Sequence, residues 1–216
     1  MIRAFVGSGG KTGTIFKQAA AYRQAGLRVL VTTSTQMGAR EGAIIGDDPA
    51  PIAEALDRCG YALAGTQANR EGKIAALSEA VFRAACAHAD VVLVEADGSR
   101  QHPLKFPAAH EPVIPEGTDE IVVICGLSAI GKPAKDVCHR LELVKAAIGI
   151  ADDTLITAEH VQKLVRTAYM MPLAEKYPGA KLTLYPCQRD TPYLRAVAAR
   201  LEAGEDVKLV SEEAFD

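Results

Sequence analysis

The sequence lacks the features that mark several common protein classes. Its five cysteines form no CxxC pair, so neither a disulfide framework nor a zinc knuckle is predicted. No apolar run approaches the 18 residues that suggest a transmembrane helix. The first residues do not combine a basic segment with a long apolar run, so no signal peptide is expected. These absences favour a cytoplasmic protein with free thiols and no membrane partner.

An excess of positive charge is also absent. The formal net charge is −3, whereas a general nucleic-acid-binding protein is basic over a whole face, so no nucleic-acid partner is expected. Hydrophobic residues make up 49% and charged residues 24%, close to the averages of globular proteins. The length of 216 residues suits one α/β domain with a sizeable core, and we expect residues 1–216 to form a single domain.

Apolar segments without polar alternation, typical of buried parallel strands, alternate with segments of helical pattern. This alternation predicts a three-layer α/β fold, with a mostly parallel sheet covered by helices on both faces. A proline-rich stretch at 99–115 is expected to be an irregular loop, because proline lacks the N–H group that regular elements need. The predicted strands are 2–6, 28–33, 61–66, 90–99, 120–126, 180–186 and 206–210, and the predicted helices are 13–25, 47–60, 78–89, 158–169 and 192–204.

The stretch GSGGKTG at 7–13 lies between a predicted strand and a predicted helix. The usual phosphate-binding signature, GxxxxGK[ST], would need glycine at Phe5, so a shorter GxxGKT beginning at Gly7 stands here. A glycine turn with a solvated lysine is the alternative, but the flanking elements favour a phosphate loop. In that interpretation Lys11 contacts the β- and γ-phosphates, the backbone N–H groups of the loop surround them, and Thr12 binds Mg²⁺.

Two acidic residues follow the buried strand VVLV. Glu95 and Asp97 would point to the same side if the strand continued through them, because side chains alternate with a period of two. A carboxylate at this position beside a phosphate loop holds Mg²⁺ directly or through water. The alternative is a simple Asp-Gly turn after the strand. We expect Glu95 to be a metal ligand and Asp97 to position the nucleophile.

Other polar residues are weaker candidates. The hydroxyls of TTST at 32–35, Thr33 among them, follow a strand at the edge where open α/β sheets bind ligands, and bonds within a turn explain them equally well. Arg100, Lys105 and His110 of the proline-rich loop could contact an anionic substrate, or be ordinary surface charges. Asp190 in CQRD has the offset of the aspartate in the NKxD sequence of guanine-selective proteins, but Cys187 and Gln188 replace its first two residues.

Several segments together resemble one family. From residue 6 to about residue 161 the chain looks like YqeC, the accessory proteins of selenium-dependent molybdenum hydroxylases. The segments that carry this resemblance are VGSGGKTG, VLVTTST, VEADGSRQHPLKFPAAHEPVIP, GLSAIGKP, and HR followed by LITAEHV. The resemblance implies a P-loop-like nucleotide-binding protein with a role in maturing or supplying the cofactor of those hydroxylases. It implies the following site residues: Gly7, Gly9, Gly10, Lys11 and Thr12 for phosphate, the acidic pair Glu95 and Asp97, and Arg100, Lys105, His110 and Glu111 in the signature loop.

The function expected from the sequence is therefore Mg²⁺-dependent binding of ATP or GTP by an NTPase or phosphotransferase. The alternatives are a non-hydrolytic carrier of selenium or molybdenum cofactor, a small-molecule kinase or ligase, and a loop that holds the phosphate of a molybdopterin-type cofactor. The expected partners are the nucleotide, a molybdenum hydroxylase or its cofactor-handling proteins, and a second copy of the chain. The complete expected set is catalytic Lys11, Glu95 and Asp97; nucleotide-binding Gly7, Ser8, Gly9, Gly10, Lys11, Thr12, Gly13, Thr33 and Asp190; substrate-binding Arg100, Lys105, His110 and Glu111; and metal-binding Thr12 and Glu95.

Overall fold

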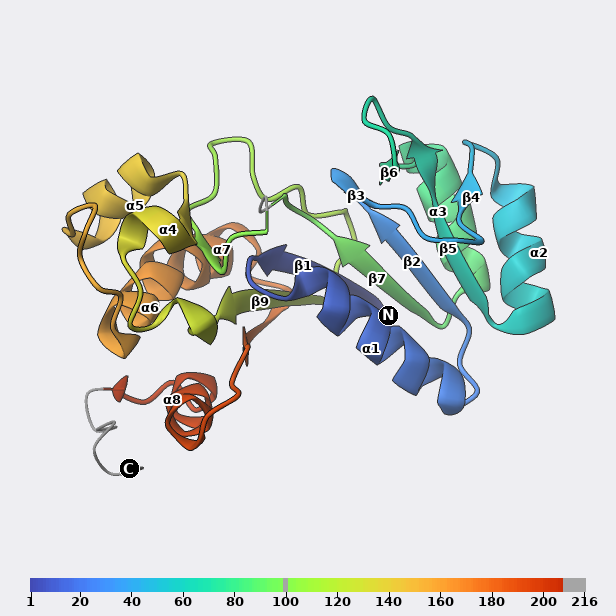
Figure 1. Cartoon of the computed structure of the whole chain (residues 1–216). Helices are drawn as coiled ribbons and strands as arrows, with labels where there is room; N and C mark the ends of the chain where they lie inside the picture. Colours follow the sequence, from blue (N-terminus) through green and yellow to red (C-terminus); the bar gives the residue numbers. More distant parts are fainter. Residues whose placement is uncertain (99–100, 208–216) are drawn as a thin grey trace. The chain divides into compact units, whose positions relative to one another are not determined.

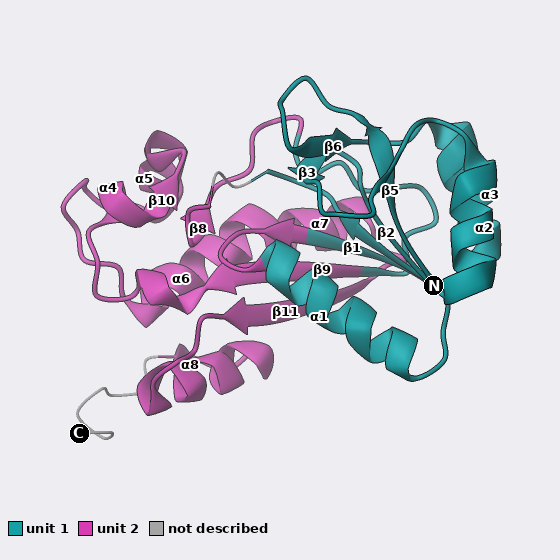
Figure 2. Cartoon of the chain, turned by 45° about the vertical axis from the view of Figure 1, so that its right-hand side comes forward, with its two compact units in different colours: residues 1–5, 11–98, 111–120 teal, residues 6–10, 99–110, 121–216 magenta. Residues whose placement is uncertain are grey.

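The structure, a computed structural model, describes residues 1–98 and 101–207. Strands and helices alternate along the chain (Figure 1). The chain forms two compact units, drawn in different colours in Figure 2, and each is built from three separate segments. Unit 1 comprises residues 1–5, 11–98 and 111–120, and unit 2 comprises residues 6–10, 99–110 and 121–216.

Unit 1 is built on a mostly parallel sheet. Its strands follow the order β1-β7-β2-β5-β6-β3, and β4 pairs with β5. The pairs β1–β7, β2–β7, β2–β5 and β4–β5 are parallel, and the short β6 is antiparallel to β5 and β3. The strand bounds are β1 Ile2–Gly7, β2 Val29–Thr33, β3 Gln36–Gly38, β4 Ile44–Ile45, β5 Tyr61–Gln67, β6 Lys73–Ala75 and β7 Val91–Glu95. Of β1, residues 2–5 belong to this unit and Val6 and Gly7 to unit 2.

Helices cover both faces of the unit 1 sheet. On one face Leu30 and Val94 pack in a buried cluster with residues of α2 (Pro49–Cys59) and α3 (Glu79–His88). Because side chains alternate along a strand, Val31 and Leu93 lie on the opposite face, where α1 (Lys11–Gln24) packs on β2 and β7. The predicted three-layer arrangement is therefore confirmed within this unit.

Local signals explain where these helices begin and end. The side chain of Asp48 accepts a hydrogen bond from the N–H of Ala50 at the start of α2, and Gly60 ends that helix in the left-handed conformation. The Ser78 side chain accepts a hydrogen bond from the N–H of Val81 at the start of α3. Each capping residue satisfies a backbone group that the helix itself leaves unpaired.

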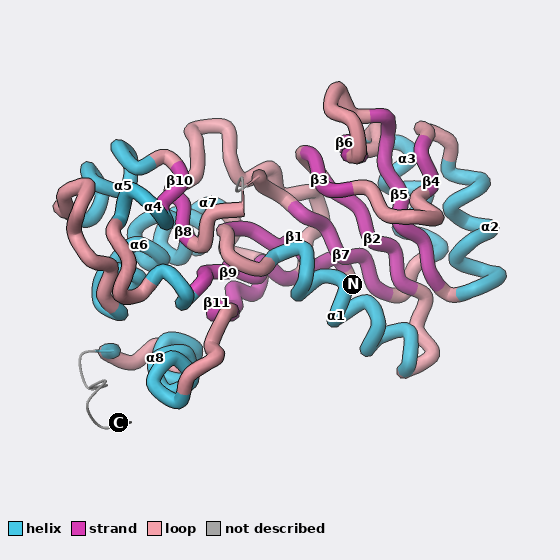
Figure 3. The backbone as a smooth tube through the Cα atoms, in the orientation of Figure 1, coloured by secondary structure: helices cyan, strands magenta, loops and turns pink. Residues whose placement is uncertain are grey.

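Unit 2 combines two long strands with a more helical segment. β9 (Glu120–Gly126, with Glu120 assigned to unit 1) is buried along its whole length, and β11 (Lys181–Cys187) is its neighbour. Two short parallel strands, β8 (Leu104–Lys105) and β10 (Cys138–His139), form a separate sheet. The helices, coloured cyan in Figure 3, are α4 Ala134–Val137, α5 Leu141–Ile148, α6 Ala158–Val165, α7 Met171–Lys176 and α8 Pro192–Glu202.

The predicted elements are present with shifted bounds, except the strand expected over 206–210, of which residues 206 and 207 do not form a strand. The helix expected over 13–25 begins two residues earlier at Lys11, and the strand expected over 90–99 ends at Glu95. The helix expected over 158–169 leaves α-helical geometry at Arg166, where a π-helical turn runs to Met170. The loop 99–115 is not wholly irregular, because it contains β8. Of the strand expected over 206–210, residues 208–210 lie outside the described residues.

None of the helices within residues 1–98 and 101–207 has both the length and the apolar character to cross a bilayer.

Candidate functional site

The first turn of α1 carries the lysine and threonine of the glycine motif. A helix start presents unpaired N–H groups and a partial positive charge, and this first turn contains no acidic residue to offset that charge. Lys11 Nζ lies 2.8 Å from Asp97 Oδ1, and the two side chains are only 3% and 0% exposed. The charge of Lys11 is thus held inside the protein by a carboxylate that comes two residues after β7.

Glu95, the last residue of β7, connects three elements. Its carboxylate oxygen Oε2 accepts a hydrogen bond of 2.7 Å from Thr12 Oγ1 in α1. Its carbonyl oxygen accepts a hydrogen bond of 2.7 Å from Thr33 Oγ1 and one of 3.1 Å from the Ser34 N–H. Thr33 and Glu95 are also opposite each other in the parallel register of β2 and β7. The carboxyl ends of these two strands therefore meet the start of α1 at Glu95.

The protein environment favours the neutral form of Glu95. Burial raises the pKa of its carboxyl above the ordinary value, and the nearby charge of Asp97 acts in the same direction. The charge of Lys11 and the hydrogen bond from Thr12 lower this pKa, but they do not compensate for burial. A cation beside Glu95 would stabilise its ionised form.

The carboxyl end of β2 and the turn that follows it contain two buried hydroxyls. Among the described residues, Thr32 Oγ1 and Thr35 Oγ1 are buried without a hydrogen-bond partner. The N–H of Thr35 donates to Thr33 Oγ1, which fixes the turn at the end of the strand. Because an unsatisfied buried hydroxyl is costly, these two groups are candidates for contact with a ligand or water. Sequence reasoning placed the TTST hydroxyls at this edge but singled out only Thr33.

The glycine turn itself belongs to unit 2, where it packs closely against other backbone segments. A side chain at Gly7 would collide with the carbonyl oxygen of Ile124. At Gly9 a Cβ atom would lie 2.5 Å from Gly126 Cα and 2.6 Å from the carbonyl oxygen of Pro103. Both glycines have positive φ, +89° and +82°, which other residues adopt at a cost. Packing alone therefore requires glycine at these two positions.

The remaining residues of the motif are fixed in different ways. Ser8 donates through its N–H to the Ile124 carbonyl and through its hydroxyl to the Pro103 carbonyl, both over 3.0 Å. Gly10 (φ +139°) lies against the side chain of Cys187, which a Cβ atom would approach to 2.9 Å. From Gly10 the chain enters α1 directly at Lys11. Gly13 is exposed on α1, and a Cβ atom there would meet nothing within 4 Å.

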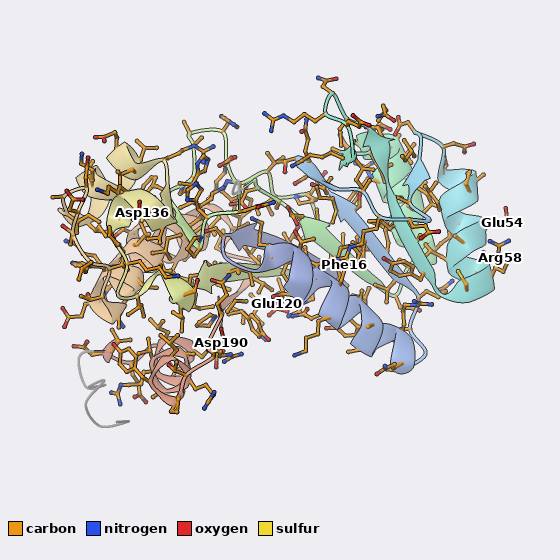
Figure 4. The ribbon with its side chains drawn as sticks, viewed as in Figure 1. Phe16, Glu54, Arg58, Glu120, Asp136 and Asp190 are labelled. Atoms are coloured by element: carbon orange, nitrogen blue, oxygen red, sulfur yellow. The ribbon has the colours of Figure 1, made fainter. Side chains whose placement is uncertain are left out.

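The other predicted site residues occupy separate places. Lys105 is buried on β8, opposite His139 of β10, while His110 is exposed. Glu111 is partly buried in unit 1. Asp190 is exposed just before α8 (Figure 4), and its carbonyl oxygen accepts a hydrogen bond from Arg195. Arg100 lies outside the described residues.

The structure thus brings together one group of predicted residues, all in unit 1: Lys11, Thr12, Thr33, Glu95 and Asp97. Sequence reasoning did not predict the pairing of Asp97 with Lys11. It also missed Pro103 and Gly126 as the residues that support the glycine turn, although Gly126 opens the GLSAIGKP segment.

No group of three or more His, Cys, Asp and Glu side chains suited to a metal occurs in the described part of the chain. A metal ion at Thr12 and Glu95 would therefore take its other ligands from phosphate oxygens or water, which is the usual state of Mg²⁺ in phosphate-binding sites.

The chain is similar in sequence to proteins of one family. The family model described as YqeC protein matches residues 3–142. Uncharacterized protein YqeC of Escherichia coli (strain K12) is 33% identical over 172 residues, which cover 74% of this chain and 66% of that protein, just under two thirds of its length.

Among solved structures, the signal recognition particle 54 kDa protein from Aeropyrum pernix K1, in complex with GDP, is similar over 96% of this chain and 40% of its own, with 16% identity and a TM-score of 0.40. Because this TM-score is low, the GDP bound to that protein is not evidence about the ligands of this chain.

Proposed function

The chain belongs to the YqeC family, and from this premise and the geometry of the site we propose that it binds a nucleoside triphosphate together with Mg²⁺. The observation that carries the proposal is the pair of contacts at the start of α1: Thr12 with Glu95 at 2.7 Å and Lys11 with Asp97 at 2.8 Å. Both contacts join the first turn of a helix, which directly follows a glycine turn, to the acidic end of a neighbouring parallel strand.

The Thr12 hydroxyl and the Glu95 carboxylate fit one Mg²⁺ ion. Neighbouring ligands of an octahedral ion with bonds of 2.0–2.1 Å lie about 2.9 Å apart, close to the separation of the two oxygens. The cation would also offset the cost of ionising a buried Glu95. Thr12 and Glu95 therefore suit the metal in both distance and charge.

Lys11 and the N–H groups at the start of α1 suit the phosphates. The start of α1 carries a partial positive charge, and the first turn of the helix contains no acidic residue that would offset it. Lys11 would contact the terminal phosphates, while Asp97 holds its ammonium in place or accepts a bond from the attacking group. Phosphoryl transfer depends mainly on such positioning and on charge stabilisation. Hydrolysis to NDP and phosphate, and transfer to a second ligand, are both consistent with these roles.

Calorimetric titration with Mg-ATP and Mg-GTP, each repeated without metal, tests the proposal. We expect metal-dependent binding of one nucleotide, weakened about 10- to 100-fold in Lys11→Ala, as the loss of a charged hydrogen bond implies. Lys17→Ala is the matched control, since Lys17 is an exposed lysine on the same helix. Thr12→Ala should abolish the metal dependence, and Thr12→Ser should retain it.

Equal affinity of wild type and Lys11→Ala for both nucleotides would contradict the proposal. Titration with a phosphorylated pterin then separates two cases. Binding that depends on Lys11 would retain the phosphate loop and replace only the nucleotide.

We further propose that the nucleotide supports the maturation of selenium-dependent molybdenum hydroxylases, the role that the YqeC resemblance implies. The test is hydroxylase activity in cells whose own copy of the gene is deleted. Complementation by Lys17→Ala but not by Lys11→Ala is expected, with both proteins present at equal levels. Full activity in the deletion strain would contradict this role.

A further inference from the structure

Unit 1 contains an apolar pocket of about 610 Å³ beside the residues that hold Glu95. Its volume lies within the 300–1,000 Å³ typical of small-molecule sites. Its walls come from β1, β2, β7, α3 and the segment 113–117. From this pocket we infer that the protein binds a second, small, uncharged ligand that is mainly apolar.

The walls show why the ligand should be apolar. Ile2, Phe82 and Cys86 pack with one side against the buried cluster below α3 and remain partly exposed on the other. Val113, which also lines the pocket, exposes 41% of its surface, a high fraction for a valine. A ligand that covered these groups would remove apolar surface from water, which is favourable by about 25 cal/mol per Å².

The charged groups at the pocket show why the ligand should be neutral. Arg83 forms ion pairs with Glu79 and with Glu116, all three lie at the pocket, and their side chains are 71–89% exposed. The one guanidinium in the lining is therefore already paired with carboxylates, and the two acids outnumber it. An anionic ligand would be repelled by the net negative charge of these side chains. A cationic ligand would gain little, because the carboxylates are solvated and already paired with Arg83.

One end of the pocket adjoins the proposed phosphate site. Thr33 and Ser34 line the pocket, and both donate hydrogen bonds to the Glu95 carbonyl oxygen. The Ser34 hydroxyl donates in addition to the carbonyl oxygen of Val113, which also lines the pocket. A polar group on the ligand would meet these hydroxyls. The inference deepens the proposed function, because it gives the chemical class of the second ligand at the same strand ends.

The neutral aromatic fluorophore N-phenyl-1-naphthylamine serves as the probe. We expect saturable binding to the full chain with a rise in fluorescence. Ala76→Phe and Cys86→Leu, which enlarge side chains in the wall, should each weaken binding about tenfold or more, the effect of losing roughly 1.4 kcal/mol. Ala84→Phe is the matched control, because Ala84 is exposed on α3 outside the pocket. Circular dichroism confirms that each variant is folded before it is compared.

Unsaturable binding, or equal affinity in all three variants, would overturn the inference. Use of two independent wall variants keeps the test decisive if one of them does not fold. The probe requires no nucleotide, so wild type should bind it in the absence of ATP, GTP and Mg²⁺. Probe binding without nucleotide binding would therefore contradict only the proposed function, and nucleotide binding without probe binding would contradict only this inference.

Discussion

At the scale of single residues, the buried pair of Lys11 and Asp97 is the most demanding contact of the site. Removing two charges from water costs several kcal/mol, and their attraction recovers that cost only in good geometry. Here Lys11 Nζ lies 2.8 Å from Asp97 Oδ1, and both side chains are almost fully buried. Replacing such a pair by apolar residues is often neutral or stabilising, so stability alone gives little reason to keep it. The proposed contact of Lys11 with phosphate gives a functional reason to keep the pair.

Glu95 permits a prediction on pH dependence. Burial raises its pKa in the folded state above the ordinary value of 4.5. A raised folded pKa contributes stability below the unfolded pKa, and that contribution is lost as pH rises through the folded pKa. Glu95→Gln cannot ionise and keeps an oxygen for Thr12. Its free energy of unfolding relative to wild type should therefore increase as pH rises from about 4.5, and then level off.

Urea unfolding of both proteins at a series of pH values measures this difference. Glu54→Gln is the control, because Glu54 is an exposed glutamate on α2 that forms an ion pair with Arg58 (Figure 4). It should show little change over the same range, as is usual for a surface ion pair. A difference for Glu95→Gln that stays flat, or falls with rising pH, would show that burial does not control this carboxyl.

At the scale of elements, the glycine turn and the first turn of α1 respond oppositely to the same substitution. Gly9→Ala places a Cβ atom 2.5 Å from Gly126 Cα at a positive φ, so we expect a loss of about 2 kcal/mol or more. Gly13→Ala meets nothing within 4 Å inside a helix, so we expect a gain of up to about 1 kcal/mol. Chemical denaturation of the two variants gives both values, and a gain in Gly9→Ala would contradict the tight packing of the turn.

How much the sequence predicts depends on the type of element. Long apolar runs such as 28–33 and 120–126 were predicted as strands to within a residue, because burial on both faces leaves a clear pattern. The short β3, β4 and β6 were not predicted, since two or three residues are too few to show a period. The π-helical turn after α6 gave no signal either.

The candidate site was predictable in its membership but not in its contacts. Lys11, Thr12 and Glu95 were recognised from glycine spacing and from a strand with an acidic end. The pairing of Lys11 with Asp97 depends on side-chain packing after the strand has ended, which no periodicity records. The apolar pocket was also hidden, because its walls come from segments more than 100 residues apart in the chain.

At the scale of the whole molecule, the chain passes between the two compact units five times, after residues 5, 10, 98, 110 and 120. In this interleaved arrangement neither unit is one continuous segment, and that residues 1–216 behave as a single domain stays a prediction. The chain has no tryptophan, so one introduced residue reports on one unit. Phe16→Trp in unit 1 and Tyr185→Trp in unit 2 replace rings that each have an arginine above them.

We expect the two tryptophan variants to unfold at the same urea concentration after correction for their own stabilities, as a single cooperative transition requires. Circular dichroism of each variant provides the common reference. Fluorescence midpoints that differ from the circular dichroism midpoint of the same variant would show that the units unfold separately.

The same interleaving has a consequence for heredity. No single cut in the gene separates the two units, because segments of one unit alternate along the reading frame with segments of the other. A single recombination event at one boundary therefore could not have joined two complete units to give this arrangement. In YqeC proteins whose segments are arranged in this order, the two units should therefore have been inherited together.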